Sequence, residues 1–146
     1  MSLNDLINDL SALGGLPFYL ATALTFLLLQ EFGTFWRLTL GLVVCYVIIS
    51  AVRSIFIRDR PKPVQYRTWW EKIDAGTAIS MHSMRAMVLA IIFMDVFRNI
   101  WVSTTLIIIA LIVAGTRMFM KKHYMADVIW GGGLGAAVGL SIVYFV

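Results

Sequence analysis

Long apolar runs, separated by short polar connections, constrain the fold of this chain more than any other feature. Five runs cover about 16–30, 35–57, 78–97, 100–119 and 126–146. Because a helix rises about 1.5 Å per residue, roughly 20 apolar residues match a hydrocarbon core of about 30 Å. Of the 146 residues 60% are hydrophobic and 14% charged, and the mean hydropathy is +0.86. We expect an all-α, multi-pass bundle of about five transmembrane helices in a cell membrane, with residues 1–146 as one domain.

A further short helix is predicted before the first apolar run. Apolar residues recur at helical spacing over 3–13, and Ser2 with Asp5 three residues later resembles a capping box. The apolar stripe is too short to cross a bilayer, and the opposite face is polar and acidic. We therefore expect this helix to lie at the membrane interface, and Gly14 and Pro17 to end it.

Cysteine usage and net charge exclude other classes of protein. Cys45 is the single cysteine and lies within an apolar run, so neither an intramolecular disulfide nor a thiolate metal cluster can form. We expect it to be a packing residue. The formal net charge is +4, but no nucleic-acid recognition module accompanies it. The basic residues instead indicate contacts with lipid head groups or phosphates, and no nucleic-acid partner is expected.

Glycines form a regular stripe in the last apolar run. Gly131, Gly135 and Gly139 recur every four residues, and such a stripe lets another helix approach closely. Packing within the chain is the favoured interpretation over dimerisation, and the sequence does not fix the oligomeric state.

Polar and ionisable side chains gather in clusters at the ends of the apolar runs. Such groups are costly in a bilayer, so each is a functional candidate. If the spans alternate in direction, these clusters all lie at one membrane face. They comprise Arg53 and Arg60 after the second run, Ser80 and His82 at the start of the third, Arg117 at the end of the fourth, and His123 and Asp127 at the entry to the fifth. On the opposite side Asp95 and Arg98 can form an i,i+3 pair, which we interpret as structural.

Two spacings within the clusters matter. Arg53 and Arg60 are seven residues apart and share a helical face if the helix continues, whereas Pro61 favours an extended approach of Arg60. Both alternatives remain open. His123 and Asp127 are four residues apart, which we expect to place them on one face of a helix.

This set of residues is suited to phosphoryl transfer. Arginine stays charged when it is desolvated, and its fork of N–H groups matches phosphate oxygens. If Asp127 accepts one ring N–H of His123, that histidine is held as a neutral nucleophile. His82 can then donate a proton to the leaving alcohol.

The clusters resemble the three motifs of the type 2 phosphatidic acid phosphatase superfamily, which are Lys-x6-Arg-Pro, Pro-Ser-Gly-His and Ser-Arg-x5-His-x3-Asp. Arg53 with Arg60-Pro61 resembles the first, Ile79-Ser80-Met81-His82 the second, and Thr116-Arg117 with His123 and Asp127 the third. The resemblance implies a membrane enzyme that removes phosphate from a lipid phosphate or pyrophosphate through a phosphohistidine, with no metal and no cofactor.

The resemblance also implies a role for each residue. By that comparison His123 is the nucleophile, His82 is the general acid, and Asp127 orients His123. The phosphate would be bound by Arg53, Arg60, Ser80, the backbone N–H of Met81, and Arg117.

Two positions depart from the second motif. Ile79 and Met81 replace its proline and glycine, and the Cβ of Met81 restricts the φ angle and crowds the anion. We therefore expect the same architecture with weakened or altered activity. The same residues leave two alternatives open, which are a lipid-phosphate-binding protein without catalysis and a phosphotransferase whose acceptor is not water. An anion carrier is disfavoured, because the charges lie at one end of the spans and no inverted repeat is visible.

Overall fold

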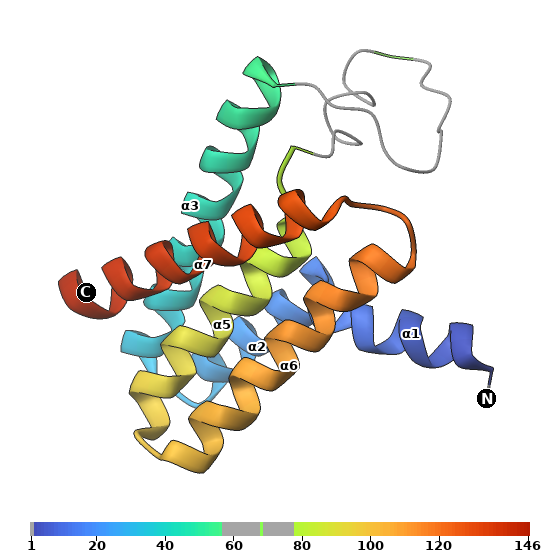
Figure 1. Ribbon diagram of the computed structural model, residues 1–146. Coiled ribbons are helices and arrows are strands. Elements are labelled where there is room, and N and C mark those ends of the chain that lie inside the picture. Colours follow the sequence, from blue (N-terminus) through green and yellow to red (C-terminus); the bar gives the residue numbers. More distant parts are fainter. Residues whose placement is uncertain (1, 57–67, 69–77) are drawn as a thin grey trace.

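The computed structural model describes residues 2–56, 68 and 78–146, and it is all-α in that part of the chain. The predicted fold class is confirmed, and each predicted apolar run coincides with a helix (Figure 1). The described helices are α1 (Leu3–Ala12), α2 (Leu16–Leu28), α3 (Phe32–Ile55), α5 (Met81–Phe97), α6 (Ile100–Phe119) and α7 (Met125–Phe145).

The described helices form a membrane bundle. Three of them, α3, α6 and α7, are long and apolar enough to cross a membrane. A fourth span results if α1 and α2, which meet at a bend of 45°, count as one. Of the five predicted spans, α2 with 13 residues and α5 with 17 are shorter than the roughly 20 residues that match a hydrocarbon core.

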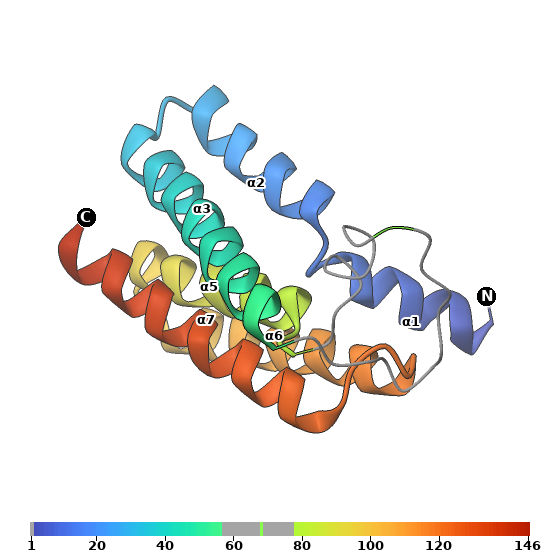
Figure 2. The same ribbon diagram turned by 90° about the horizontal axis from the view of Figure 1, so that it is seen from above.

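The N-terminal helix begins as the sequence predicts. The backbone N–H of Asp5 donates to Ser2 Oγ at 3.2 Å, and the N–H of Ser2 donates to Asp5 Oδ2 at 2.8 Å, which completes the capping box. Helix α1 ends before Gly14, and Pro17 lies in the first turn of α2, where its missing N–H costs no hydrogen bond. From this junction α1 and α2 point in different directions (Figure 2). Helix α1 packs against α6.

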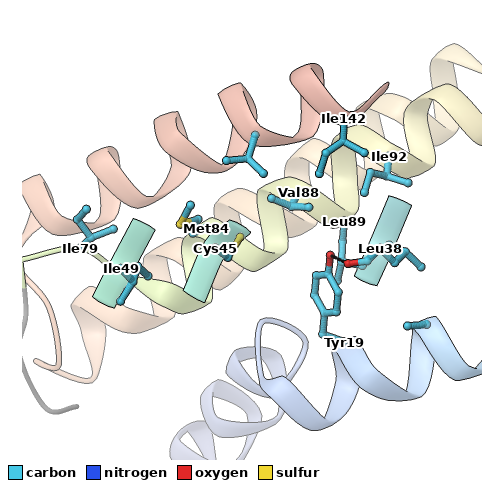
Figure 3. Packing of buried hydrophobic residues seen from close by; sticks show 12 residues of the cluster. Tyr19, Leu38, Cys45, Ile49, Ile79, Met84, Val88, Leu89, Ile92 and Ile142 are labelled. Carbon is cyan, nitrogen blue, oxygen red and sulfur yellow. Dashed lines mark hydrogen bonds between the residues drawn. The ribbon is translucent and has the colours of Figure 1, made fainter. Parts of the chain in front are cut away.

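Helix α5 lies at the centre of the bundle, where it contacts α3, α6 and α7. Its apolar side chains pack in a core with residues of α2, α3 and α7 (Figure 3). Tyr19 is fully buried there, and its hydroxyl donates to the carbonyl of Leu38 at 2.9 Å, which satisfies the polar end of the side chain. Cys45 is a buried free thiol in the same core, as expected for a packing residue.

The glycine stripe of α7 faces α5. A Cβ built on Gly131 would lie 2.5 Å from the carbonyl oxygen of Ser80, and one on Gly135 would lie 2.5 Å from that of Met84. At Gly139 a Cβ would lie 2.7 Å from Cβ of Ile91. The stripe therefore serves packing within the chain, as the sequence favoured.

We expect Gly135→Ala to destabilise the protein. Its methyl group would meet the backbone of α5, which cannot move aside as a flexible side chain can, so the free energy of unfolding should fall by about 1–3 kcal/mol. Gly133→Ala is the matched control, because a Cβ there meets nothing within 4 Å. The control should gain up to about 1 kcal/mol from helix propensity. Thermal unfolding in detergent measures both, and equal melting temperatures would contradict this close approach.

At the C-terminal end of α5 an ion-pair network joins α5 to α3. Arg98 Nη2 lies 3.4 Å from Asp95 Oδ1, which confirms the predicted pair. Asp95 Oδ2 also accepts a hydrogen bond of 2.8 Å from Arg37 Nη1 on α3. The network thus links α3 to α5, and partial exposure limits its contribution to stability.

Candidate active site

Four helix ends carry the polar clusters that the sequence singles out. Arg53 lies in the last turn of α3 and Arg117 in the last turn of α6. The other two helices begin there, with Ser80 as the N-cap of α5 and Asp127 in the first turn of α7. All are nearly buried, with exposed fractions of 0% for Ser80, 2% for Asp127, 6% for His123, 7% for Arg117 and 9% for Arg53. Polar groups that are buried to this extent need hydrogen-bonding or charged partners.

A backbone hydrogen bond joins the starts of α5 and α7. The N–H of Ser80 donates to the carbonyl of Asp127 at 2.9 Å. Gly131 makes this approach possible, because any side chain there would collide with the backbone of Ser80. This main-chain bond therefore fixes the cluster of Ser80 and His82 relative to the cluster of His123 and Asp127.

The hydroxyl of Ser80 caps α5. Ser80 Oγ accepts from the N–H of Ser83 at 3.4 Å and from the hydroxyl of Ser83 at 2.9 Å. Ser83 was not among the predicted site residues, although a serine three residues after an N-cap is a signal for such a contact. The cap fixes the first turn of α5, whose N-terminus carries the positive end of the helix dipole.

Arg53 spans from α3 to the segment before α5. Its Nη2 donates to the carbonyl of Ile79 at 3.5 Å, which places the guanidinium beside the start of α5, where Ser80 lies. Helix α3 ends at Ile55, and Phe56 is extended with φ of −117° and ψ of 91°. Arg60 and Pro61 lie outside the described residues, so the position predicted for Arg60 stays a prediction.

His123 and Asp127 approach each other, but not along one helix face. His123 Nδ1 lies 3.8 Å from Asp127 Oδ2, which is ion-pair range and longer than a hydrogen bond. Asp127 Oδ2 also accepts from the N–H of Tyr124 at 2.9 Å. His123 lies in the turn before α7, so the prediction that both residues share a helical face is wrong.

The cause is the turn between α6 and α7. Lys121 adopts a left-handed conformation with φ of 52°, and the N–H groups of Lys122 and His123 then donate to the carbonyl of Arg117 at 3.1 and 3.3 Å. These bonds satisfy a carbonyl at the end of α6 and turn the chain back. The turn therefore holds His123 close to Arg117.

The second histidine lies at the same end of the bundle. His82 lies in the first turn of α5 and is partly exposed. It follows Ser80, the N-cap whose backbone N–H is bonded to Asp127, by two residues. The structure therefore brings both histidines, Asp127, Ser80 and the two described arginines of the predicted site to one end of the bundle.

Within the described part of the chain, no group of three or more His, Cys, Asp or Glu side chains is arranged as a metal site. The described cations at this end of the bundle include the guanidinium groups of Arg53 and Arg117. Such a site suits an anion with several oxygens, because each guanidinium can donate two parallel N–H bonds to it.

Comparison with known proteins identifies the family. The sequence matches the PAP2 superfamily over residues 34–146. This chain belongs to the PAP2 superfamily. The crystal structure of LpxE from Aquifex aeolicus has the same fold, with a TM-score of 0.82 over 98% of this chain and 86% of that one, at 14% sequence identity. No curated protein sequence matches the chain. The family resemblance inferred from the three motifs is thus confirmed.

Methionine fits the backbone at the position where the PAP2 motif has glycine. Met81 is the first residue of α5 and is not among the described residues with positive φ. The Cβ therefore imposes no backbone strain here. Whether its side chain crowds a bound anion stays a prediction.

Sequence reasoning missed a contribution from the N-terminal segment, which precedes the matched PAP2 region. Arg117 Nη1 donates to Ser11 Oγ at 2.7 Å, and Arg85 Nε donates to the carbonyl of Gly14 at 3.0 Å. Ser11 follows Ile7 by four residues, so it interrupts the apolar face of α1. A polar residue on an apolar helix face is the signal that could have revealed this contact.

Proposed function

We propose that this PAP2 superfamily protein hydrolyses the terminal phosphate or pyrophosphate of a membrane lipid, through a phosphohistidine on His123 and without a metal ion. Family membership supports a lipid phosphatase. The observation that carries the finer assignment is the buried cluster in which Asp127 approaches one nitrogen of His123, with Arg117 at the adjoining end of α6 and His82 in the first turn of α5.

Binding of the phosphate comes first. In this proposal Arg53 and Arg117 donate N–H bonds to its oxygens, and Arg60 adds a third guanidinium. Ser80 and the N–H of Met81 contribute neutral donors at the start of α5, where the helix dipole favours an anion. Together these donors balance the charge of the phosphoryl group during transfer, which is the main task in such a reaction.

The two histidines then divide the transfer. Asp127 approaches Nδ1 of His123, which leaves Nε2 to form the bond to phosphorus while the bond to the lipid oxygen breaks. His82 gives its proton to that oxygen, so the lipid leaves as an alcohol from a lipid phosphate, or as a lipid monophosphate from a lipid pyrophosphate. In the second step His82 takes a proton from water, the water oxygen bonds to phosphorus, and the bond to His123 breaks with release of phosphate.

The position of the site supports a substrate that lies in the membrane. We propose a multi-pass protein of a cell membrane, in which the site lies at the end of the spans, within reach of lipid head groups. A lipid phosphate and a lipid pyrophosphate both present a terminal phosphoryl group to such a site. Residues 1–146 form one catalytic domain in this proposal.

The function is tested by phosphate release from a panel of lipids in detergent micelles. Phosphatidate, phosphatidylglycerophosphate and a polyprenyl pyrophosphate differ in their leaving groups, and we expect release from at least one. Binding of every lipid without release would instead indicate a non-catalytic binder. Transfer of the phosphoryl group to an added alcohol, with no free phosphate released, would indicate a phosphotransferase.

We expect the activity to survive chelation and to be blocked by vanadate. Guanidinium groups and backbone N–H groups hold the anion in this proposal, so EDTA removes nothing essential, and vanadate can occupy the phosphoryl position. A magnesium-dependent phosphatase is assayed in parallel, and its loss of activity shows that chelation is effective. Loss of activity in EDTA with recovery on adding magnesium would contradict the metal-independent mechanism.

A further inference from the structure

The closest contact between the N-terminal segment and the site is the hydrogen bond from Arg117 to Ser11. It measures 2.7 Å from Nη1 to Oγ and joins residues 106 positions apart. Both side chains are nearly buried, with exposed fractions of 7% and 5%. Ser11 is the buried residue of α1, and the structure describes all ten residues of that helix. Helix α1 thus directs its one buried side chain to an arginine of the candidate site.

A second contact fixes the segment beside His82. A Cβ on Gly14 would lie 2.8 Å from the carbonyl oxygen of His82 and 2.6 Å from Val113, so only glycine allows this approach. Arg85 donates to the carbonyl of the same glycine at 3.0 Å. The position of Ser11 relative to the site is therefore held by main chain as well as by its own hydrogen bond.

A hydrogen bond to one guanidinium nitrogen restricts rotation of the whole planar group. An unrestrained arginine side chain must be ordered when it binds an anion, and that ordering costs free energy. A buried bond from a charged donor is among the stronger ones in proteins, and here it holds Nη1 in place. The plane of the guanidinium is then set before phosphate arrives.

We propose that Ser11 is a positioning residue of the phosphate site, which orients the guanidinium of Arg117 for binding the phosphoryl group. This inference rests on the proposed function for the role of Arg117. It assigns a part in anion binding to α1, which lies outside the region that matches the PAP2 superfamily.

The test measures vanadate binding by calorimetry to the full chain in detergent. Ser11→Ala should raise the Kd for vanadate about tenfold, since a bond to a charged group is lost. Ser11→Thr keeps the hydroxyl and should restore binding. Asn8→Ala is the matched control, because Asn8 is an exposed residue of the same helix and should leave Kd unchanged.

A double-mutant cycle separates positioning from a general effect on folding. In the Arg117→Ala background the other arginines still bind vanadate weakly, and adding Ser11→Ala should change Kd no further. Equal weakening by Ser11→Ala in both backgrounds, or no weakening in the wild-type background, would overturn the role of Ser11.

Lipid hydrolysis by the unmodified protein is measured in the same preparation. Absence of hydrolysis would overturn the proposed function. The coupling between Ser11 and Arg117 is measured separately, by the double-mutant cycle in vanadate binding. The two failures are therefore distinguishable.

Discussion

His123→Ala is expected to lower kcat/KM for lipid phosphate by roughly 10⁴-fold or more, because removal of a covalent nucleophile leaves only the binding contribution to catalysis. The imidazole of His123 is held near Asp127 and near the end of α6, whereas His82, the other histidine of the cluster, lies in the first turn of α5. Initial rates of phosphate release measure the effect.

A neighbouring substitution controls for disturbance of the turn. Met125 begins α7 two residues after His123 and is 63% exposed, so Met125→Ala should keep its activity within about twofold, as surface changes usually do. If His123→Ala retains a tenth or more of the wild-type rate, with a similar melting temperature, His123 is not the nucleophile.

His82→Ala is expected to slow hydrolysis by about 10²–10⁴-fold for a lipid substrate, whose alkoxide leaves poorly without a proton. The loss in the transfer step should be much smaller for an activated aryl phosphate, because its leaving oxygen needs no proton. The burst of phenol release, measured by stopped flow, reports this step alone. The later hydrolysis of phosphohistidine should remain slow for both substrates, since His82 also activates the water.

The comparison of substrates is the decisive part of this prediction. A structural role for His82 would slow release of both leaving groups equally. Equal losses for the lipid and the aryl phosphate in the transfer step would therefore contradict its assignment as the general acid.

Local patterns in the sequence account for most of the fold. The apolar runs predicted the helices because a bilayer helix must satisfy its hydrogen bonds internally and face lipid with apolar side chains. The Ser2 and Asp5 capping box and the Asp95 and Arg98 pair were predictable because each joins residues within one helical turn. The glycine stripe of α7 indicated close packing, but only the structure shows that α5 is its partner.

The remaining features depend on long-range contacts or on turns. Arg37 contacts Asp95, 58 positions along the chain, and Arg117 contacts Ser11, 106 positions away. No local sequence pattern predicts either contact. His123 was expected on a helix face because spacing alone does not reveal that Lys121 turns the chain with a positive φ. Alternating spans predicted that the polar clusters share one face, but not which atoms meet there.

Acid-quench trapping of the covalent intermediate tests most directly whether His123 is the nucleophile. The purified protein is mixed with a lipid or aryl phosphate labelled at phosphorus, quenched within milliseconds, and digested under conditions that preserve phosphohistidine for mass spectrometry. We expect label on the peptide that contains His123, accumulation of this label in His82→Ala with the aryl substrate, and no label in His123→Ala. Label on His82, or wild-type labelling of His123→Ala, would contradict the assignment of His123 as the nucleophile.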